Sequence, residues 1–405
     1  MMFLQYWPLG TWGVTVGTYI AANTGAGGSG IFSAGFAGYS TMAGAVGSLV
    51  SPVLIGYLSD RYFSAERLVA VMHVGCALAA WGMYESGTQA VFFLWLVAYF
   101  QCFTPAASLT NKIGLKHLAN SDAEYPLVRI SGTLGWIVAG LFVGFAWPAV
   151  AGASIEATRT PLIIGAIGSV AMAFYSLTLP NTPPEGRVSV LTPGAIRRSG
   201  ELIRNRPFVA FLFVSMLACI PSMAYNNFGN LFLNEQLYPR PAALMTLGQI
   251  SDLLFLALSP WLIARVGLRF LFVSGMIAWA VRYALLAAGS HFGIAAPVVA
   301  AILMQGPCYV FIYVIGVMYV DHLTGGVHRG AAQGMYALAS SGVGHLLGAL
   351  MVGMTQATFL TPAGVTPAPF DWTPFWLVPA AVSAATVVVF RVAFKPHNVD
   401  ALRAI

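Results

Sequence analysis

Apolar runs of about 20 residues recur from one end of this chain to the other, and that is the length a helix needs to cross a bilayer. In lipid every backbone polar group must be satisfied within the protein, so such runs fold as helices and not as loops or open sheet edges. The pattern predicts an all-α polytopic membrane protein with twelve transmembrane helices. The centres of the runs fall near Gly13, Gly47, Ala77, Ala98, Val138, Val170, Met216, Leu254, Ile277, Tyr309, Gly344 and Ala384.

Charged residues are few and unevenly placed. They make up 8% of the chain, against roughly 25% in soluble domains. With the N-terminus placed inside, most basic residues between or beside spans fall on one side: Arg61, Arg67, Lys112, Lys116, Arg187, Arg197, Arg198, Arg204, Arg206, Arg265, Arg269, Arg329, Arg391, Lys395 and Arg403. Only Arg159 and Arg240 fall opposite. This positive-inside bias predicts that both termini lie in the cytoplasm, and it explains the net charge of +6 without a nucleic-acid partner.

The connection from Asn181 to Pro207 is polar, contains proline and glycine, and carries five arginines. It predicts an N-terminal six-helix half at residues 1–180, a cytoplasmic linker at 181–206 and a C-terminal six-helix half at 207–405. In duplicated transporters of this kind the substrate site lies between the halves, near the middle of the membrane.

Asp252 lies in the middle of the apolar run from Ala242 to Ala264. An ionised carboxylate at that depth costs several kcal/mol unless it faces a polar cavity or has a buried partner. Arg282, in the next span, is the candidate partner. The residue predicts a transporter with a polar centre.

Signals for an enzyme are absent from the sequence. It contains no HExxH, no GxSxG and no clustered His, Cys and Asp set, so we expect no catalytic residue, no metal and no cofactor. A membrane enzyme is therefore disfavoured, as is a sensor, which would normally carry a soluble output domain. The cysteines lie in apolar spans without a CxxC pair, and we expect free thiols at Cys76, Cys102, Cys219 and Cys308.

The connection after the second run reads GYLSDR, from Gly56 to Arg61. It resembles the G-x-L-x-D-R signature of the major facilitator superfamily. The resemblance implies a conformational-switch loop formed by Gly56, Asp60 and Arg61, in which Asp60 caps the next turn or pairs with a basic residue in another conformation.

Six ordered segments resemble the bacterial nucleoside:proton symporter family. They are FLQYWPLGTW (3–12), TPAASLTN (104–111), RISGTLGW (129–136), NNFGNLFL (226–233), QISDLLF (249–255) and AAQGMY (331–336). The resemblance implies a nucleoside substrate, a coupling proton and alternating access in a lipid bilayer, and we expect a monomer.

Arg129, Thr133 and Trp136 match the arginine, threonine and aromatic residue that line the family's pocket. Their i, i+4 and i+7 spacing puts them on one helix face. The alternatives are an arginine that extends to the cytoplasm and a tryptophan that serves as packing.

Asn226 matches a pocket asparagine, and Asn230 follows one turn later. Two asparagines on one helix face favour pocket lining, and hydrogen bonding to neighbouring helices is the alternative. The family's glutamine before them is replaced by Met223. Gln249 and Asp252 match a glutamine and a glutamate spaced i, i+3, which implies an amide for the base and a carboxylate for the ribose.

Gln305 and Tyr309 stand where the family has two aromatic pocket residues. Beside the second, the family has an aspartate linked to proton coupling, and this chain has Val310. Either Asp252 carries the coupling proton, or the protein is an uncoupled nucleoside facilitator. A transporter of sugars or drugs with the same fold is the further alternative.

Overall fold

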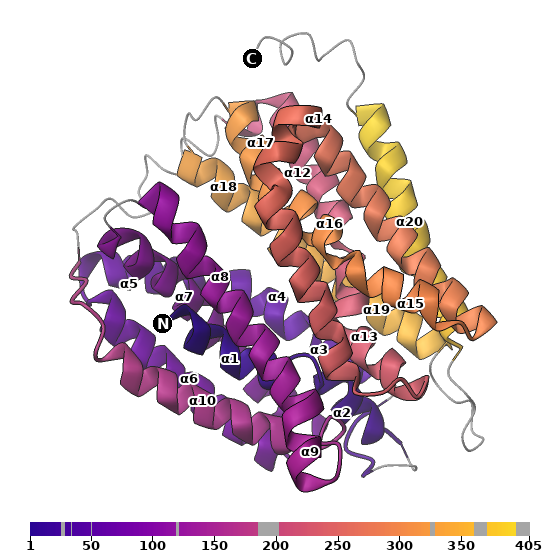
Figure 1. The fold of residues 1–405 in the computed structure, drawn as a ribbon. Coiled ribbons are helices and arrows are strands. Elements are labelled where there is room, and N and C mark those ends of the chain that lie inside the picture. The colour runs from indigo at the N-terminus through magenta and orange to yellow at the C-terminus, as the bar shows by residue number, and fades with distance from the viewer. Residues whose placement is uncertain are drawn as a thin grey trace. The chain divides into compact units, whose positions relative to one another are not determined.

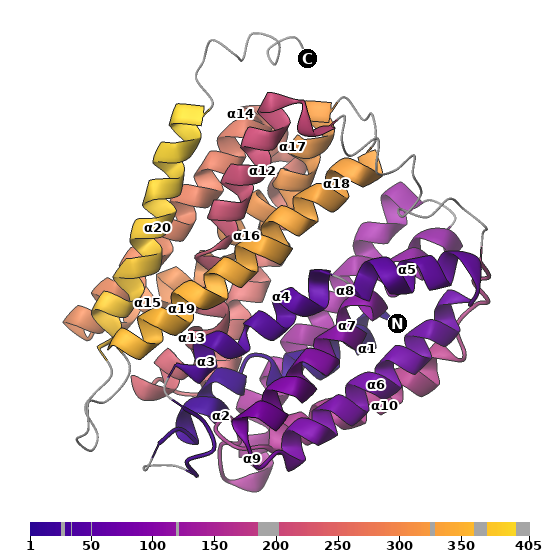
Figure 2. The same cartoon turned by 180° about the vertical axis from the view of Figure 1, so that it is seen from behind.

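The computed structural model of the chain is built from helices (Figures 1 and 2). It describes residues 1–25, 29–33, 35–49, 51–118, 121–184, 202–324, 329–359 and 371–393. Within these ranges no strand occurs, and one isolated bridge joins Thr24 to Phe32. The all-α prediction is confirmed. Most of the predicted linker, at 185–201, lies outside the described residues.

The first part of the chain forms short helices followed by long ones. Their bounds are α1 (Met2–Trp12), α2 (Val16–Ala22), α3 (Phe36–Ser40), α4 (Met42–Leu49), α5 (Ser51–Arg61), α6 (Ala65–Glu85), α7 (Gln89–His117), α8 (Ser121–Leu141), the π-helical η1 (Phe142–Ala146), α9 (Trp147–Ala151) and α10 (Thr160–Ser176).

The second part contains the longest helix of the described chain. The bounds are α12 (Arg206–Cys219), α13 (Ser222–Glu235), α14 (Pro241–Phe292), α15 (Ala295–Leu303), α16 (Gln305–Tyr309), the π-helical η2 (Val310–Val314), α17 (Ile315–Thr324), α18 (Arg329–Ala337), the π-helical η3 (Leu338–Gly344), α19 (His345–Phe359) and α20 (Trp372–Ala393).

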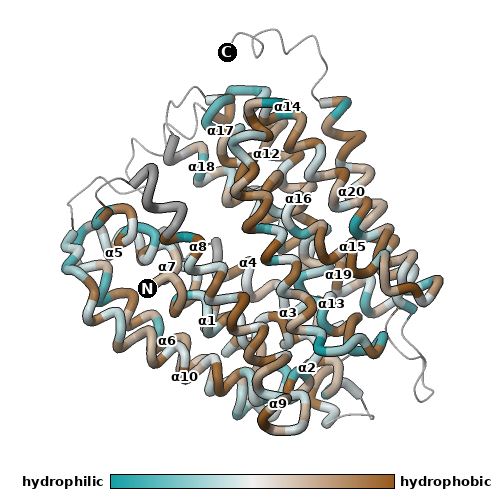
Figure 3. Tube along the Cα trace, viewed as in Figure 1, coloured by the Kyte–Doolittle hydropathy of each residue, from teal (hydrophilic) through white to brown (hydrophobic). Residues whose placement is uncertain are grey.

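Many of these helices are apolar along most of their length, as the brown stretches in Figure 3 show. Eight helical stretches of the described chain are long and apolar enough to cross a membrane, and Thr160–Ser176 is a shorter apolar helix. One of the eight, Pro241–Phe292, has a non-helical residue inside it, Gly267, with φ 78° and ψ 160°. That positive φ suits glycine and turns the chain between two helical segments.

Helix irregularities interrupt several other stretches. α1 and α2 are separated by a turn at Gly13–Thr15, and η1, η2 and η3 are π-helical insertions between α-helical segments. Such insertions are frequent at functional sites, and η2 directly follows the segment that carries Gln305 and Tyr309.

The chain folds into two compact units. Unit 1 comprises Met1–Val190, Tyr225–Gln249 and Val352–Ala368, and unit 2 comprises Leu191–Ala224, Ile250–Met351 and Pro369–Ile405. Unit 1 thus combines the helices before the linker with most of α13, the start of α14 and the end of α19.

Unit 1 is organised around α1, which packs against α8 and α10, while α6 packs against α7 and α10. The backbones approach very closely. A Cβ at Gly135 of α8 would collide with the Phe3 carbonyl of α1, and a Cβ at Gly165 of α10 would lie 2.7 Å from Trp12 Cδ1. Glycine at these positions lets α1 lie in contact with both neighbours.

In unit 2, α12 packs against α17, η3 and α20. A run of stacked rings, Trp279, Tyr283, Trp376 and Trp372, joins the second segment of α14 to α20. All four cysteines of the chain are free, as predicted.

Candidate functional site

Asp252, on α14 in unit 2, lies beside two polar side chains. Its side chain is half-buried, and its Oδ1 is buried without a hydrogen-bond partner among the described residues. The carboxylate hydrogen-bonds with Gln305 and interacts electrostatically with Arg282. Gln305 in turn accepts a hydrogen bond of 2.5 Å from Arg282 Nη1 at its Oε1. The three side chains therefore form a chain from Arg282 through Gln305 to Asp252.

Contacts of α14 with the end of α15 and the start of α16 bring Asp252 beside Gln305. Ser251 Oγ donates to the Leu303 carbonyl at 2.5 Å and accepts from the Gly306 amide at 3.3 Å. A Cβ at Gly306 would lie 2.5 Å from the Ser251 carbonyl oxygen, so only glycine permits this approach. The neighbours of Ser251 and Gly306, which are Asp252 and Gln305, are positioned by these contacts.

Arg282 is 0% exposed. Its guanidinium lies 5.3 Å from the Trp279 ring centroid and also interacts with Cys308. A buried charge is strongly destabilising unless a partner compensates it. Asp252 supplies the opposite charge, so the Arg282–Gln305–Asp252 chain is held together by electrostatics as well as by hydrogen bonds.

Tyr309 and Val310 follow on the same stretch of chain and have different surroundings. The Tyr309 ring is 42% exposed and lies 4.5 Å from the Tyr313 ring. Val310 is 2% exposed and packs in an apolar cluster with Leu271 and Ile315. The position at which the family resemblance implies an aspartate is therefore an apolar core residue in this structure.

Arg129 lies in unit 1, where its guanidinium stacks over the Tyr6 ring at 4.7 Å from the centroid. Thr133 and Trp136, further along α8, are half-buried. The Trp136 backbone lies against Gly10 of α1, where a Cβ would come within 3.1 Å of Trp136 Cα. α1 thus contacts α8 at Arg129 and at Trp136.

Asn226 and Asn230, one turn apart on α13, have different environments. Asn226 is exposed, whereas Asn230 is 1% exposed and accepts a hydrogen bond of 2.6 Å from Thr18 Oγ1. Asn230 also donates to Glu156 Oε2 at 2.7 Å. Its amide is hydrogen-bonded within the protein, and pocket lining together with Asn226 stays a prediction.

Gln249 belongs to unit 1 and is half-buried. The predicted residues therefore fall into two groups. Unit 1 contains Arg129, Thr133, Trp136, Asn226 and Gln249, and unit 2 contains Asp252, Gln305 and Tyr309.

The predicted switch loop lies at the end of α5. Arg61 is exposed and donates from Nη1 to Tyr57 Oη at 3.1 Å. Gly56 is half-buried, and the side chain of Asp60 lies outside the described part of the chain.

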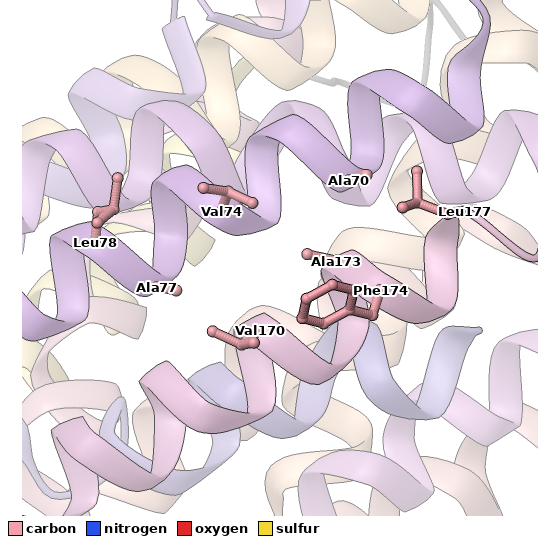
Figure 4. Close-up of a pocket in the computed structure, with 8 residues that line it drawn as sticks. All are labelled: Ala70, Val74, Ala77, Leu78, Val170, Ala173, Phe174 and Leu177. Atoms are coloured by element: carbon pink, nitrogen blue, oxygen red, sulfur yellow. The ribbon is translucent and has the colours of Figure 1, made fainter.

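A separate apolar pocket of about 250 Å³ lies between α6 and α10 (Figure 4). Its lining residues are Ala70, Val74, Ala77, Leu78, Val170, Ala173, Phe174 and Leu177. These side chains offer no hydrogen-bonding group, so the pocket is suited to apolar chains and not to a polar solute.

Two residues of these groups were missed or only partly recognised in the sequence. Tyr6, the ring under Arg129, lies in the segment FLQYWPLGTW, but nothing in the local pattern identifies its partner. Arg282 was recognised as a counter-charge for Asp252, but not as a donor to Gln305. The position of this arginine within an apolar span is the sequence feature that indicates a buried partner.

The helices and polar groups define the class of protein. Long apolar helices carry a few internal polar groups, and the described residues contain no cluster of His, Cys, Asp and Glu that could hold a metal. The long apolar helices define a multi-pass membrane protein. The model of the nucleoside H⁺ symporter family matches residues 1–399, and the chain belongs to that family.

Known relatives and a solved structure agree with this assignment. The chain is 32% identical to the putative nucleoside transporter YegT of Escherichia coli, over 98% of this chain and 93% of the relative. It is 27% identical to the nucleoside permease NupG of Escherichia coli, over 98% of this chain and 95% of that one. The crystal structure of the nucleoside transporter NupG matches with a TM-score of 0.84 and 25% identity over 97% of each chain. The protein is a transporter with a fold of the major facilitator type, and not an enzyme.

Proposed function

We propose that this protein imports nucleosides across the bacterial inner membrane by proton symport, through alternating access of two six-helix halves at 1–180 and 207–405 joined by the 181–206 linker. It would work as a monomer with twelve spans and both termini in the cytoplasm. Family membership supports the substrate class and the coupling, because the matching family is that of nucleoside H⁺ symporters.

One observation carries the proposal at the level of residues. Asp252 has a buried carboxylate oxygen with no hydrogen-bond partner among the described residues, within an apolar helix. A buried polar atom without a hydrogen-bond partner destabilises the folded protein, so we expect such an atom to have a functional role. A ribose hydroxyl would satisfy it by donating a hydrogen bond, and a proton would satisfy it by removing the charge.

The remaining predicted residues supply complementary chemistry. Trp136 offers a ring face for a nucleobase, and Gln249 an amide that can pair with a base edge. Arg129 offers planar guanidinium donors.

Three further side chains complete the proposed set. Thr133 offers a hydroxyl, Asn226 an exposed amide and Tyr309 a partly exposed ring. Gln305 contributes less directly, because its carbonyl oxygen is already occupied by Arg282.

The test is uptake of a panel of radiolabelled nucleosides into proteoliposomes, with and without an imposed inward pH gradient. Saturable uptake that nucleosides compete for, and that the gradient drives above equilibrium, is expected. Competition by hexoses or lipophilic cations, without competition by nucleosides, would contradict the substrate class.

An uncoupled nucleoside facilitator is the second candidate, and the buried Val310 favours it. The Val310 side chain cannot exchange a proton, and it packs against apolar side chains. In this case uptake would stop when the nucleoside concentrations on the two sides are equal, and the uptake rate would not depend on the pH gradient.

A further inference from the structure

Glu156 lies in the connection between α9 and α10 and is 1% exposed. Its carboxylate accepts three hydrogen bonds. Oε2 accepts from Asn230 Nδ2 at 2.7 Å and from Asn234 Nδ2 at 3.1 Å, while Oε1 accepts from the backbone amide of Ala242 at 3.2 Å. Ala242 lies in the first turn of α14, where the helix dipole favours a negative charge. A residue of the first half of the sequence is therefore bound to two helices of the second half.

Asn230 connects this carboxylate to α2. Its Oδ1 accepts from Thr18 Oγ1 at 2.6 Å and from Asn234 Nδ2 at 3.0 Å. Thr18, Glu156, Asn230, Asn234 and the Ala242 amide form one continuous hydrogen-bond network within unit 1, which we call the outer latch. The name refers to the predicted orientation, which puts the connection containing Glu156 outside the cell.

The neighbouring charged residues do not replace these contacts. Arg159 donates to Tyr19 Oη at 3.0 Å and to the Tyr84 carbonyl at 2.9 Å, and the guanidinium of Arg240 lies over the Phe145 ring at 4.3 Å. Glu235, next to Asn234, is exposed. The buried charge of Glu156 is therefore held by the neutral donors of the outer latch.

Close packing accompanies the outer latch within unit 1. A Cβ at Gly17 of α2 would collide with the Asn227 carbonyl of α13, and a Cβ at Gly38 of α3 would lie 2.5 Å from Gly353 Cα of α19. The Gly38 amide donates to Gln356 Oε1 at 2.8 Å. α13 and α19 thus lie in direct contact with the N-terminal helices here.

We propose that Glu156 is a positioning residue of the transport cycle, which holds the outer side closed through the outer latch and must release Asn230 and Asn234 before the outer side opens. The inference rests on the alternating access proposed above but not on the identity of the substrate. Since three donors converge on one buried carboxylate, loss of its acceptor capacity shifts the equilibrium toward the open outer side.

A reporter cysteine tests this in whole cells. Thr15 is 2% exposed and lies at the N-cap of α2, three residues before Thr18. Labelling of Thr15→Cys by a membrane-impermeant maleimide measures opening to the outside. The chain without the reporter gives the background from the native cysteines, which are buried or half-buried.

Glu156→Gln replaces one of the two carboxylate oxygens with an amide nitrogen, which cannot accept. At least one of the three donors, from Asn230, Asn234 and Ala242, then loses its acceptor and faces another donor. We expect the labelling rate to rise about tenfold or more, as the loss of hydrogen bonds to a buried charged acceptor implies. Adding Asn230→Asp exchanges the carboxylate and the amide across the contact, and restores an acceptor for Thr18 and for Asn234. This double variant should label close to the wild-type rate.

Glu235→Gln is the matched control, since it removes an exposed carboxylate from α13, the helix that carries Asn230 and Asn234. The labelling rate of the reporter should not change in this variant. If Glu156→Gln does not accumulate in the membrane, Asn234→Ala removes a single donor and should still raise labelling. Wild-type labelling in both variants, or failure of the exchange to restore it, would overturn the proposal. Because labelling needs no nucleoside, absent nucleoside uptake would contradict the proposed function and leave this result standing.

Discussion

Arg282 donates a hydrogen bond of 2.5 Å from Nη1 to Oε1 of Gln305, and this bond determines which end of the Gln305 amide is available to Asp252. With Oε1 occupied as an acceptor, the Nε2 group is the donor left for the carboxylate. Arg282 therefore influences Asp252 in two ways, by its charge and by the orientation it imposes on Gln305.

Replacement of Arg282 should impair transport more than replacement of an exposed arginine on the same helix. Arg282→Gln leaves Asp252 buried without its counter-charge, and breaking a buried pair costs about 3–5 kcal/mol. We expect uptake to fall at least tenfold and the thermal unfolding temperature of the detergent-purified protein to decrease. Arg265→Gln, which removes an exposed guanidinium over the Trp261 ring, should leave both close to wild type. Equal effects of the two substitutions would show that the buried chain has no special role.

The sequence was sufficient to predict the helical membrane architecture, because apolar runs of spanning length report on helices directly. It did not predict the turn between α1 and α2 or the π-helical η2, because these depend on how a helix meets its neighbours. Gly13, for example, is followed by a turn at Thr15 whose hydroxyl donates to the Trp12 carbonyl at 3.2 Å.

The candidate site was predictable where a charged residue stands within an otherwise apolar span, as Asp252 and Arg282 do. Contacts between distant segments were not predictable. Asn230 lies on the same helical face as Asn226, yet its hydrogen-bond partner Glu156 is 74 positions away in the sequence. Neither the periodicity of α13 nor the composition of the Glu156 connection contains that information.

Gln249→Ala should weaken uridine binding about tenfold or more, because a buried amide that pairs with a nucleobase contributes about 1–3 kcal/mol when its loss leaves a partner unsatisfied. Isothermal titration or equilibrium binding on the purified protein measures this. Gln236→Ala removes an exposed amide just beyond α13 and serves as the control, with no expected change. A dissociation constant unaffected by Gln249→Ala would remove this residue from the proposed site.

Arg129→Lys should impair uptake nearly as much as Arg129→Ala, because an ammonium group cannot reproduce the planar donors of guanidinium or its stacking over Tyr6. Initial uptake rates at several nucleoside concentrations separate a loss of affinity from a loss of turnover. Tyr6→Phe keeps the ring beneath the guanidinium and should retain most activity. Full transport by the lysine variant would instead mean that Arg129 only extends its charge to the membrane surface.

Asp252→Asn should separate substrate binding from coupling. The asparagine is similar in size and can hydrogen-bond, but it cannot exchange a proton. Because the family resemblance implies a coupling aspartate at the position of Val310, Asp252 is the acid we expect to carry the proton. The variant should therefore still exchange labelled nucleoside for unlabelled nucleoside across the membrane of proteoliposomes. It should lose accumulation above equilibrium when an inward pH gradient is imposed.

Asp321→Asn is the control for that experiment, since it changes an acid at the far end of α17, where Asp321 accepts a hydrogen bond of 3.0 Å from Gln333. This variant should keep gradient-driven accumulation. Accumulation that survives in Asp252→Asn would remove the coupling role from this residue. Wild-type uptake that ignores the gradient altogether would identify the protein as a facilitator, in which the apolar Val310 has replaced the proton-carrying acid and Asp252 serves only the ribose.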